Sequence, residues 1–263
     1  NQQISPDDSK FRSASCLFKK QKITNLMFGE FRKNIIISAD DFGISRLASQ
    51  NILSLAKKNK IDRAEVMVSK NITPEEVRLL IDSRIKIDIH FHLAKEKIDQ
   101  WQTEKRNLDE GAAKRIAVFL FNYISGKNRS KKVEKEWENQ INDFIKIFGR
   151  KPDGISSHEY IHFFPPYFKI FSKISKKYNI EYMRFGREYP KTINLISLIL
   201  NILRMINYPA FKNSKTVTSD LMVSFDWIGN PKQHIYQIFS GKKAEIIFHP
   251  EKEEEYKILD QIP

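Results

Sequence analysis

The chain has 263 residues, which fits one α/β domain of barrel size or at most two small domains. Apolar residues make up 41% of the sequence, enough for a sizeable core, so the composition excludes a disordered protein. The formal net charge of +13 would attract nucleic acid, anionic lipid or acidic glycans, but the lysines are spread over most of the chain and no recognisable nucleic-acid motif accompanies them. We therefore expect a solvated basic surface and no nucleic-acid partner.

Cysteine usage and hydropathy bear on the compartment. The single cysteine, Cys16, leaves no internal disulfide, which suits a reducing environment. The first 30 residues contain no apolar run of signal-peptide length, and no apolar stretch reaches the roughly 18 residues of a membrane span. These features predict a cytoplasmic protein.

In chain order, residues 1–33 are polar and basic without clear periodicity, and we interpret them as an irregular lead-in to a single domain over residues 34–263. Short apolar runs rich in β-branched residues, and one stretch of clean alternation, predict strands. The strands cover residues 34–38, 64–68, 86–92, 180–184, 216–224 and 244–248, with one more leading into Ser157. Apolar residues at helical spacing predict helices between the strands. The helices cover residues 48–56, 133–148, 167–178 and 193–206, with others starting at the capping box of Thr73 to Glu76 and at Asn230.

The helix predicted over residues 193–206 is apolar except for one narrow stripe. Its polar residues recur every three or four positions and are Asn194, Ser197, Asn201 and Arg204. This pattern is typical of a helix that is buried, or that lies against a partner or a membrane surface. We favour packing against the rest of the protein.

The alternation of strands and helices predicts a mostly parallel sheet. Residues able to do chemistry come directly after four of the predicted strands. They are Asp40 with Asp41, His90, His158 and His249. Because the carboxyl ends of parallel strands meet at one edge of a sheet, we expect these side chains to gather in one site.

These residue types suit metal-assisted hydrolysis. A carboxylate and two histidines can hold Zn²⁺ or a similar ion, and a second carboxylate can handle a proton. A strand-end histidine followed by proline, as at His249, is held rigidly enough to act as a general acid near neutral pH. Each motif also has a simpler interpretation: the two acids as solvated loop residues or a helix N-cap, the other histidines as structural residues, and His249 as a strand cap. Spacing alone does not select the ligands.

Four segments of the chain resemble the YdjC-like carbohydrate deacetylase family, which includes chitooligosaccharide deacetylases and a hopanoid-biosynthesis branch. They are Asn34 to Ser45 (NIIISADDFGIS), Ile87 to Leu93 (IDIHFHL), Ser156 to Pro165 (SSHEYIHFFP) and Ile246 to Pro250 (IIFHP). Their order and spacing match the family over about residues 34 to 250. The resemblance implies the α/β class and a distorted, TIM-like (β/α) barrel with mostly parallel strands.

The resemblance also implies a metal centre. Asp41, His90 and His158 would hold one divalent metal ion. Mg²⁺ or Zn²⁺ is expected first, and Co²⁺, Mn²⁺ or Ni²⁺ is also compatible with such ligands.

Further roles follow from the same resemblance. Asp40 would be the general base, and His249 a general acid or a contact to the transition state. His162 and Arg184 would lie in the substrate pocket.

The chain departs from the family at positions near these residues. Asp88 stands where the family usually has Gly, Ser156 replaces the usual Asp, Tyr160 replaces the middle His, and Ala94 stands where a Thr is usual. The implied ligands are retained, so the departures concern the groups that orient the ligands and choose the substrate.

The predicted reaction is removal of an acetyl group from an N-acetylated sugar, or from a sugar-containing lipid, by a metal-activated water. Two alternatives stay open. One is a metal-dependent hydrolase of another amide or of a phosphoester, and the other is a non-catalytic glycan-binding protein. The sequence also allows peripheral contact with a membrane and a homodimer.

Overall fold

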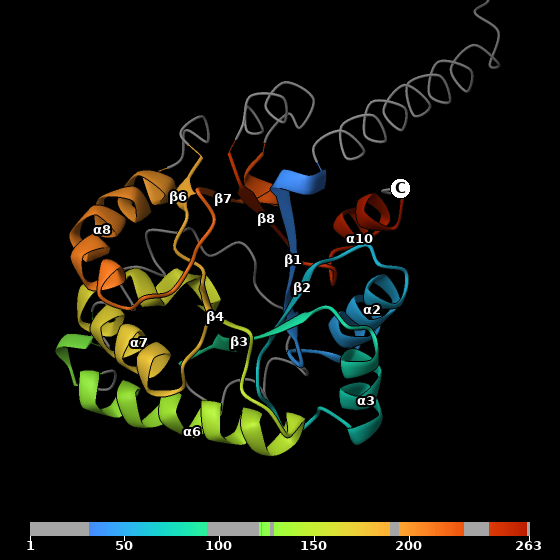
Figure 1. The fold of residues 1–263 in the computed structure, drawn as a ribbon, viewed down its shortest axis with the longest axis horizontal. Coiled ribbons are helices and arrows are strands. Elements are labelled where there is room, and N and C mark those ends of the chain that lie inside the picture. The colour runs from blue at the N-terminus through green and yellow to red at the C-terminus, as the bar shows by residue number, and fades with distance from the viewer. Residues whose placement is uncertain are drawn as a thin grey trace, which may run out of the picture.

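The computed structural model describes residues 32–93, 121, 123–126, 129–189, 195–228 and 242–261. Cys16, the lead-in up to residue 31 and the helix predicted at Asn230 lie outside these ranges. The division into a lead-in and one domain therefore stays a prediction. The described part alternates strands with helices along the chain (Figure 1).

Within the described ranges, eight strands form one sheet, and all neighbours in it pair in parallel. The strands are β1 (Ile35–Phe42), β2 (Arg63–Val66), β3 (Lys86–Phe91), β4 (Gly154–Ser157), β5 (Tyr182–Met183), β6 (Arg187–Glu188), β7 (Leu221–Ser224) and β8 (Ala244–Phe248). Their spatial order, β5-β4-β3-β2-β1-β8-β7-β6, follows the chain and pairs the last strand with the first. The sheet is therefore a curled barrel whose seam lies between β5 and β6.

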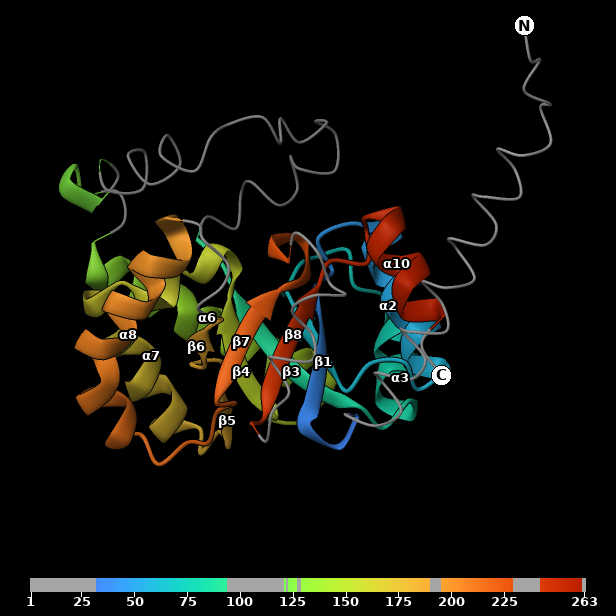
Figure 2. The same ribbon diagram turned by 90° about the horizontal axis from the view of Figure 1, so that it is seen from above.

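The helices cover the outside of this sheet. They are η1 (Arg32–Asn34), α2 (Arg46–Lys57), α3 (Pro74–Asp82), α6 (Ser130–Phe148), η2 (His158–Phe163), α7 (Pro165–Lys177), α8 (Leu195–Lys212), η3 (Phe225–Trp227) and α10 (Glu253–Asp260). Helices α2, α3 and α10 lie on one side of the strands, and α7 and α8 lie on the other (Figure 2). The predicted distorted, TIM-like barrel with parallel strands is confirmed.

The seam shows where the barrel is distorted. Strands β5 and β6 are two residues long and do not pair with each other. Instead, the N–H of Met183 donates to the carbonyl of Val217 at 3.0 Å, and the N–H of Val217 donates to the carbonyl of Glu181 at 2.9 Å. The segment that leads into β7 thus makes the backbone hydrogen bonds that connect β5 to the rest of the barrel across the seam.

The predicted elements agree with the structure in place and differ in length. The capping box is confirmed: Thr73 Oγ1 accepts from the N–H of Glu76 at 3.2 Å, and the N–H of Thr73 donates to the Glu76 carboxylate at 2.8 Å. Strand β1 runs past its predicted end to Phe42, whereas β7 begins at Leu221. Strand β6 and helix α10 were not predicted, because β6 is very short and α10 has few buried apolar residues.

Alternate residues of the strands face two different environments. On β3, Ile87, Ile89 and Phe91 belong to the hydrophobic core between sheet and helices. Asp88 and His90 point the other way and are also buried. The alternation predicted for this strand is therefore confirmed, and the inside of the barrel is polar.

The barrel interior toward the end where the strands begin, called the lower interior below, holds a buried ion pair. The guanidinium of Arg63 donates to both carboxylate oxygens of Asp88, at 2.5 and 2.7 Å, and lies 4.0 Å from the centre of the Tyr182 ring. On the next strand, a Cβ at Gly154 would lie 2.6 Å from Arg63 Nη2 and 2.8 Å from the Asp88 carboxyl group. Asp88 thus forms an ion pair with Arg63. Any side chain at position 154 would collide with this pair, so glycine is required there.

We predict that Gly154→Ala lowers the free energy of unfolding by about 1–3 kcal/mol, because the added methyl group overpacks the ion pair. Urea denaturation of the metal-free protein measures this loss. The same substitution on an Asp88→Ala background should cost much less, since the end of Arg63 can then move away. Equal costs on both backgrounds would show that the ion pair does not set the need for glycine.

Helix α8 packs against the protein, as favoured from the sequence, but it does so through its polar stripe. Asn201 bonds to the backbone of Glu188, and Arg204 Nε donates to the carbonyl of Phe185 at 2.9 Å. One turn further on, Asn207 donates to the carbonyl of Phe163 at 2.7 Å. Asn201, Arg204 and Asn207 therefore lie on the inner face beside the buried Leu200, and each satisfies a backbone group of the protein.

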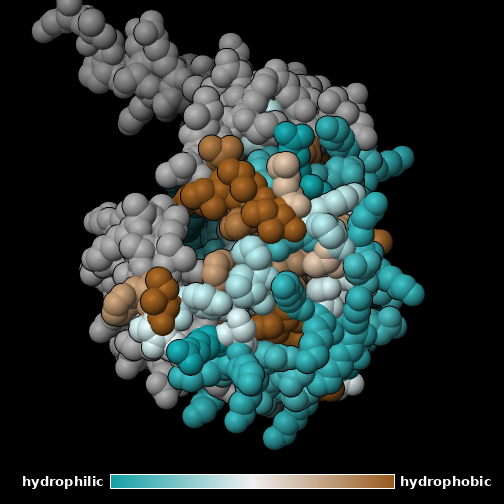
Figure 3. All heavy atoms as spheres, turned by 90° about the vertical axis from the view of Figure 1, so that its left-hand side faces the viewer, coloured by the Kyte–Doolittle hydropathy of each residue, from teal (hydrophilic) through white to brown (hydrophobic). Residues whose placement is uncertain are grey.

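The opposite face of α8 is apolar and exposed. Leu198, Ile202, Met205 and Ile206 are between 49% and 73% exposed. A patch of apolar side chains is visible on this side of the molecule (Figure 3). Within the described ranges, no helix combines the length and the hydropathy that a membrane span requires.

Candidate active site

The end of β1 brings two consecutive carboxylates into the barrel. The pairing of β1 with β2 shifts between Ala39 and Phe42, so that one extra residue is inserted in β1. Asp41 takes a left-handed backbone conformation, with φ of 72°, which aspartate tolerates better than most residues. Neighbouring residues on a regular strand face opposite ways, so this bulge allows Asp40 and Asp41 to serve one site.

The turn after these acids requires glycine. Gly43 has φ of 92°, and a Cβ there would lie 2.5 Å from the carbonyl oxygen of Met67. The N–H of Ile44 donates to the carbonyl of Asp41 at 3.1 Å and closes the turn. A tight turn at Gly43 therefore follows the two acids.

Asp41, His90 and His158 lie together, as predicted. Oδ1 of Asp41 is 3.0 Å from Nδ1 of His158 and 3.6 Å from Nε2 of His90. The two imidazole rings are nearly perpendicular, with centroids 5.7 Å apart. The three side chains come from the ends of β1, β3 and β4, so the sheet itself holds them at one point.

This group fits a divalent cation. One carboxylate oxygen and two imidazole nitrogens lie within 4.8 Å of one another, a donor set that transition metals accept. Oδ2 of Asp41 is buried and has no hydrogen-bond partner among the described residues. Since an unsatisfied buried oxygen is costly, a cation at this place would satisfy it.

Electrostatics keeps the group ready for a metal. Burial alone would raise the pKa of Asp41, but His158, His90 and His249 together outweigh burial, and the pKa lies well below its usual value. Burial lowers the pKa of His90 to about 3, so its ring is neutral at pH 7. A carboxylate and a neutral imidazole are the forms that bind metal ions.

Asp40 lies beside this group and is held by Arg184. The guanidinium donates to both oxygens of Asp40, at 2.7 and 2.8 Å, and Oδ2 of Asp40 is 3.7 Å from Nε2 of His90. Burial would raise the pKa of Asp40, but Arg184 and His90 outweigh burial, and the pKa is lowered. Asp40 is therefore ionised at neutral pH and able to accept a proton.

Arg184 is 1% exposed and spans the barrel from the end of β5. Besides Asp40, its Nε donates to Glu245 at 2.8 Å and its Nη2 lies 3.1 Å from Glu65. Three carboxylates thus surround one guanidinium. The position predicted to contact substrate is occupied by a side chain that already has protein partners.

His162 is also fully buried. Its Nε2 donates to the carbonyl of Arg184 at 2.9 Å, its Nδ1 lies 2.6 Å from the hydroxyl of Ser157, and its ring stacks on Phe171. These contacts fix the turn that follows His158. The role of His162 and Arg184 in substrate binding stays a prediction, and the geometry gives both a function in holding the site together.

We predict that protonation of His162 couples unfolding to pH. Burial lowers its pKa to about 3, below the value of about 6.5 in an unfolded chain. The unfolded state therefore binds more protons between these values, and stability is lost as the pH falls through this window. His162→Gln should reduce the dependence of the unfolding free energy on pH, measured by urea denaturation from pH 6.5 to 5, by about 1 kcal/mol per pH unit on average, rising toward the one-proton limit of about 1.4 near pH 5. A variant with an unchanged slope would contradict a buried neutral His162.

His249 follows β8 at the same end of the barrel. Its N–H donates to Glu255 on α10 at 2.6 Å, and its ring Nδ1 is 3.7 Å from the same carboxylate. Burial alone would lower the pKa of His249, but the carboxylates of Glu255, Asp41 and Asp40 outweigh it and raise the pKa to about 9. His249 is therefore protonated at neutral pH and able to donate a proton.

A second group of metal-ligand types surrounds His249, formed with Asp226 and Glu255. The ammonium of Lys252 lies 2.9 Å from Asp226 and 3.0 Å from Glu255. A cation thus already neutralises these two carboxylates. The group is a network of charges around His249 rather than a second metal centre.

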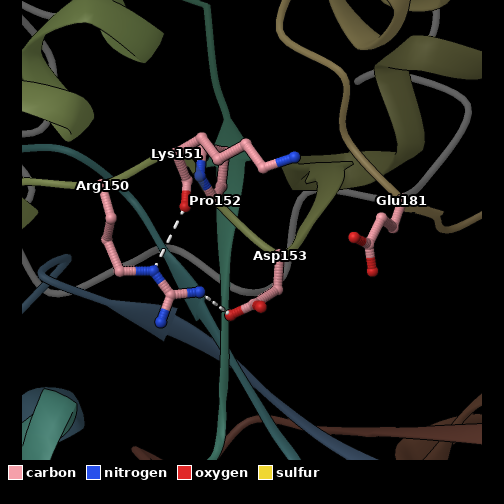
Figure 4. Close-up of a pocket in the computed structure, with 5 residues that line it drawn as sticks. All are labelled: Arg150, Lys151, Pro152, Asp153 and Glu181. Carbon is pink, nitrogen blue, oxygen red and sulfur yellow. Dashed lines mark hydrogen bonds and ion pairs between the residues drawn. The ribbon is translucent and has the colours of Figure 1, made fainter.

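A surface hollow lies at the opposite end of the barrel, before β4 and β5 (Figure 4). It is lined by Arg150, Lys151, Pro152, Asp153 and Glu181. Arg150 donates to Asp153, and Lys151 donates to the carbonyl of Asn179, both at 2.5 Å. No predicted site residue lines this hollow.

Two residues of the site were missed from the sequence. Glu65 and Glu245 are fully buried acids in the middle of β2 and β8 and contact Arg184. Each interrupts an apolar run, as AEVMV (residues 64–68) and AEIIF (residues 244–248) show. A charged residue inside a buried strand needs a partner, and this signal could have identified both.

Comparisons with known proteins identify the family. The family model described as YdjC-like protein matches residues 34–262. A carbohydrate deacetylase from Halalkalibacterium halodurans is 23% identical over 168 residues, which cover 64% of this chain and 70% of that protein. A chitooligosaccharide deacetylase from Escherichia fergusonii is 24% identical over 156 residues, which cover 59% of this chain and 60% of that protein.

One solved structure shares the fold. It comes from Enterococcus faecalis V583 and is described as a candidate cellobiose-phosphate cleavage protein. The TM-score is 0.56 at 18% identity, over 86% of this chain and 89% of that chain. The likeness supports the barrel architecture.

Proposed function

The chain belongs to the YdjC-like protein family, and we propose that it is a metal-dependent hydrolase that removes the acetyl group from an N-acetylated sugar. The observation that carries this proposal is the convergence of Asp41, His90 and His158 beside an ionised Asp40. The relatives that are named deacetylases supply the reaction and the class of substrate.

Asp41, His90 and His158 would hold one divalent ion, with Zn²⁺ or Mg²⁺ as the first candidates and Co²⁺, Mn²⁺ or Ni²⁺ also compatible. When bound, such an ion lowers the pKa of a water molecule and polarises the carbonyl group that is attacked. The carboxylate of Asp41 and the neutral ring of His90 are already in the forms that this requires.

Asp40 would be the general base. Its carboxylate is 3.7 Å from His90. Both terminal nitrogens of Arg184 donate hydrogen bonds to this carboxylate. This clamp fixes the orientation of Asp40 and keeps it ionised, and each oxygen retains a lone pair that can accept the proton of the attacking water. We assign Arg184 to this clamp, because its guanidinium is fully buried among carboxylates.

His249 would be the general acid. It is a cation at neutral pH and directly follows β8, the strand that pairs with β1 on the side away from β2 and β3. Its charge would be available to the leaving group on that side of the site. Proton donation to the amine nitrogen breaks the amide bond and yields acetate and a free amino sugar. The two titrating groups thus have opposite charges at the same pH, as acid and base require.

We predict that Asp40→Asn lowers kcat by about 10²–10⁴-fold while metal content stays the same, because only the proton acceptor is lost. Asp41→Asn should lower both activity and metal content, since it removes a ligand. Acetate release and elemental analysis measure the two effects, and thermal unfolding controls for folding. Full activity in Asp40→Asn would overturn the assignment of the base.

A substrate panel tests the reaction itself. We expect the metal-loaded protein to release acetate from N-acetylglucosamine oligomers and no phosphate from sugar phosphates. Phosphate release, or acetate release only from non-sugar amides, would reassign the site to another hydrolase. A purified protein without metal, and without gain on adding Zn²⁺, Mg²⁺ or Co²⁺, would favour a glycan-binding protein without turnover.

A sugar-containing lipid as substrate, a cytoplasmic location, a homodimer and peripheral contact with a membrane remain predictions from the sequence. The exposed apolar face of α8 is compatible with contact to a membrane or to a second copy.

A further inference from the structure

Two hydrogen bonds connect His90 to a carboxylate in the middle of the barrel. Nδ1 of His90 lies 2.6 Å from Oγ of Ser156, and that hydroxyl donates to Oε2 of Glu65. The three side chains are at most 2% exposed. The register of β3 and β4 places His90 directly beside Ser156, and Glu65 reaches the hydroxyl from β2. Three neighbouring strands therefore contribute to one chain of contacts.

The chain of contacts defines where the proton of His90 sits. A serine hydroxyl has one hydrogen, and Ser156 gives it to Glu65. Its oxygen can then only accept from Nδ1 of His90, so Nδ1 carries the proton. Nε2 is left with a lone pair, and it is this atom that lies 3.6 Å from Asp41. A histidine that binds a metal needs such a lone pair, and the hydrogen bond at its other nitrogen selects it.

We infer that Glu65, acting through the hydroxyl of Ser156, is a positioning residue that fixes His90 with its Nε2 lone pair toward Asp41 and His158. The inference rests on the proposed function to the extent that His90 is a metal ligand. It assigns a task to a buried acid whose Oε2 is 3.8 Å from Nδ1 of His90, beyond hydrogen-bond distance. It also explains how a serine beside His90 can orient the ring, because the carboxylate is supplied from another strand.

Glu65 also contacts Arg184, so its removal alone could disturb the barrel. Ser156→Ala is the cleaner variant, because it removes the connection and leaves both Glu65 and His90 in place. Ser38→Ala is a matched control. Ser38 is a buried serine that donates to a buried carboxylate, Glu245, at 2.8 Å.

Two measurements on the full chain test the inference. Two-bond ¹⁵N–¹H correlation spectra of the metal-free protein report the tautomer of His90, and competition with a chelator gives the Kd for Zn²⁺ and Co²⁺. We expect Nδ1–H in the wild type, a mixture or Nε2–H in Ser156→Ala and Glu65→Gln, and a Kd that is about 10–100-fold weaker in both. Ser38→Ala should change neither quantity.

A relocated carboxylate provides a rescue. Exchanging Glu65→Ser and Ser156→Asp together moves the acid from β2 to β4, beside Nδ1, and should restore the tautomer and most of the affinity. Nε2–H in the wild type, or Ser156→Ala that behaves like Ser38→Ala, would overturn the inference even if acetate is released. If the wild type binds no metal, the proposed function fails, and the comparison of tautomers alone decides this inference.

Discussion

A single buried guanidinium, that of Arg184, is the interaction on which the barrel and its site both depend. It contacts carboxylates from β1, β2 and β8, at Asp40, Glu65 and Glu245. An unpaired charge inside a protein is very costly, so the arginine and its partners must be in place together. Strand β5, from which Arg184 extends, has only two residues in the sheet. Side-chain contacts across the interior therefore join the strands at the place where the backbone ladder is weakest.

The interior of this barrel differs from the usual one, in which branched aliphatic side chains fill the layers. Here a lower layer holds Arg63 and Asp88, and the layer above holds Arg184 with its acids. Each buried ionic group needs its partner at a fixed distance, and a pair of long side chains needs space. Small residues that leave this space are therefore as important for packing as the charged residues. Gly154 leaves room for the lower pair, and Tyr182 donates to Glu245 at 2.6 Å between the layers. The same groups that fill the barrel also orient the site, which makes stability and activity hard to separate by mutation.

Much of the site could be predicted from the sequence because it follows strand ends. Asp40, Asp41, His90 and His158 each come after an apolar run, and parallel strands bring such positions to one edge. The bulge that allows two consecutive acids to face the barrel leaves no mark in a hydropathy pattern. The interrupted apolar runs mark Glu65 and Glu245 as buried acids, but their pairing with Arg184 depends on contacts across the barrel, which no local pattern encodes. Helix α8 shows a further limit of periodicity. The sequence shows the polar stripe, but it does not show that Arg204 and Asn207 turn inward to bond backbone carbonyls while an apolar face stays exposed.

The wide spacing of these contacts along the chain sets the order in which the protein can mature. Asp40 and Arg184 are 144 positions apart, Asp41 and His158 are 117 apart, and Ser38 and Glu245 are 207 apart. Such contacts form only after long loops close, which is slow compared with local helix formation. Strand β8 is the last strand of the described sheet to be synthesised, and both Glu245 and His249 depend on it. A nascent chain without β8 would therefore already contain Asp41, His90 and His158 and the pair of Asp40 with Arg184, but it would lack Glu245, which holds Arg184 from the other side, and the cation of His249.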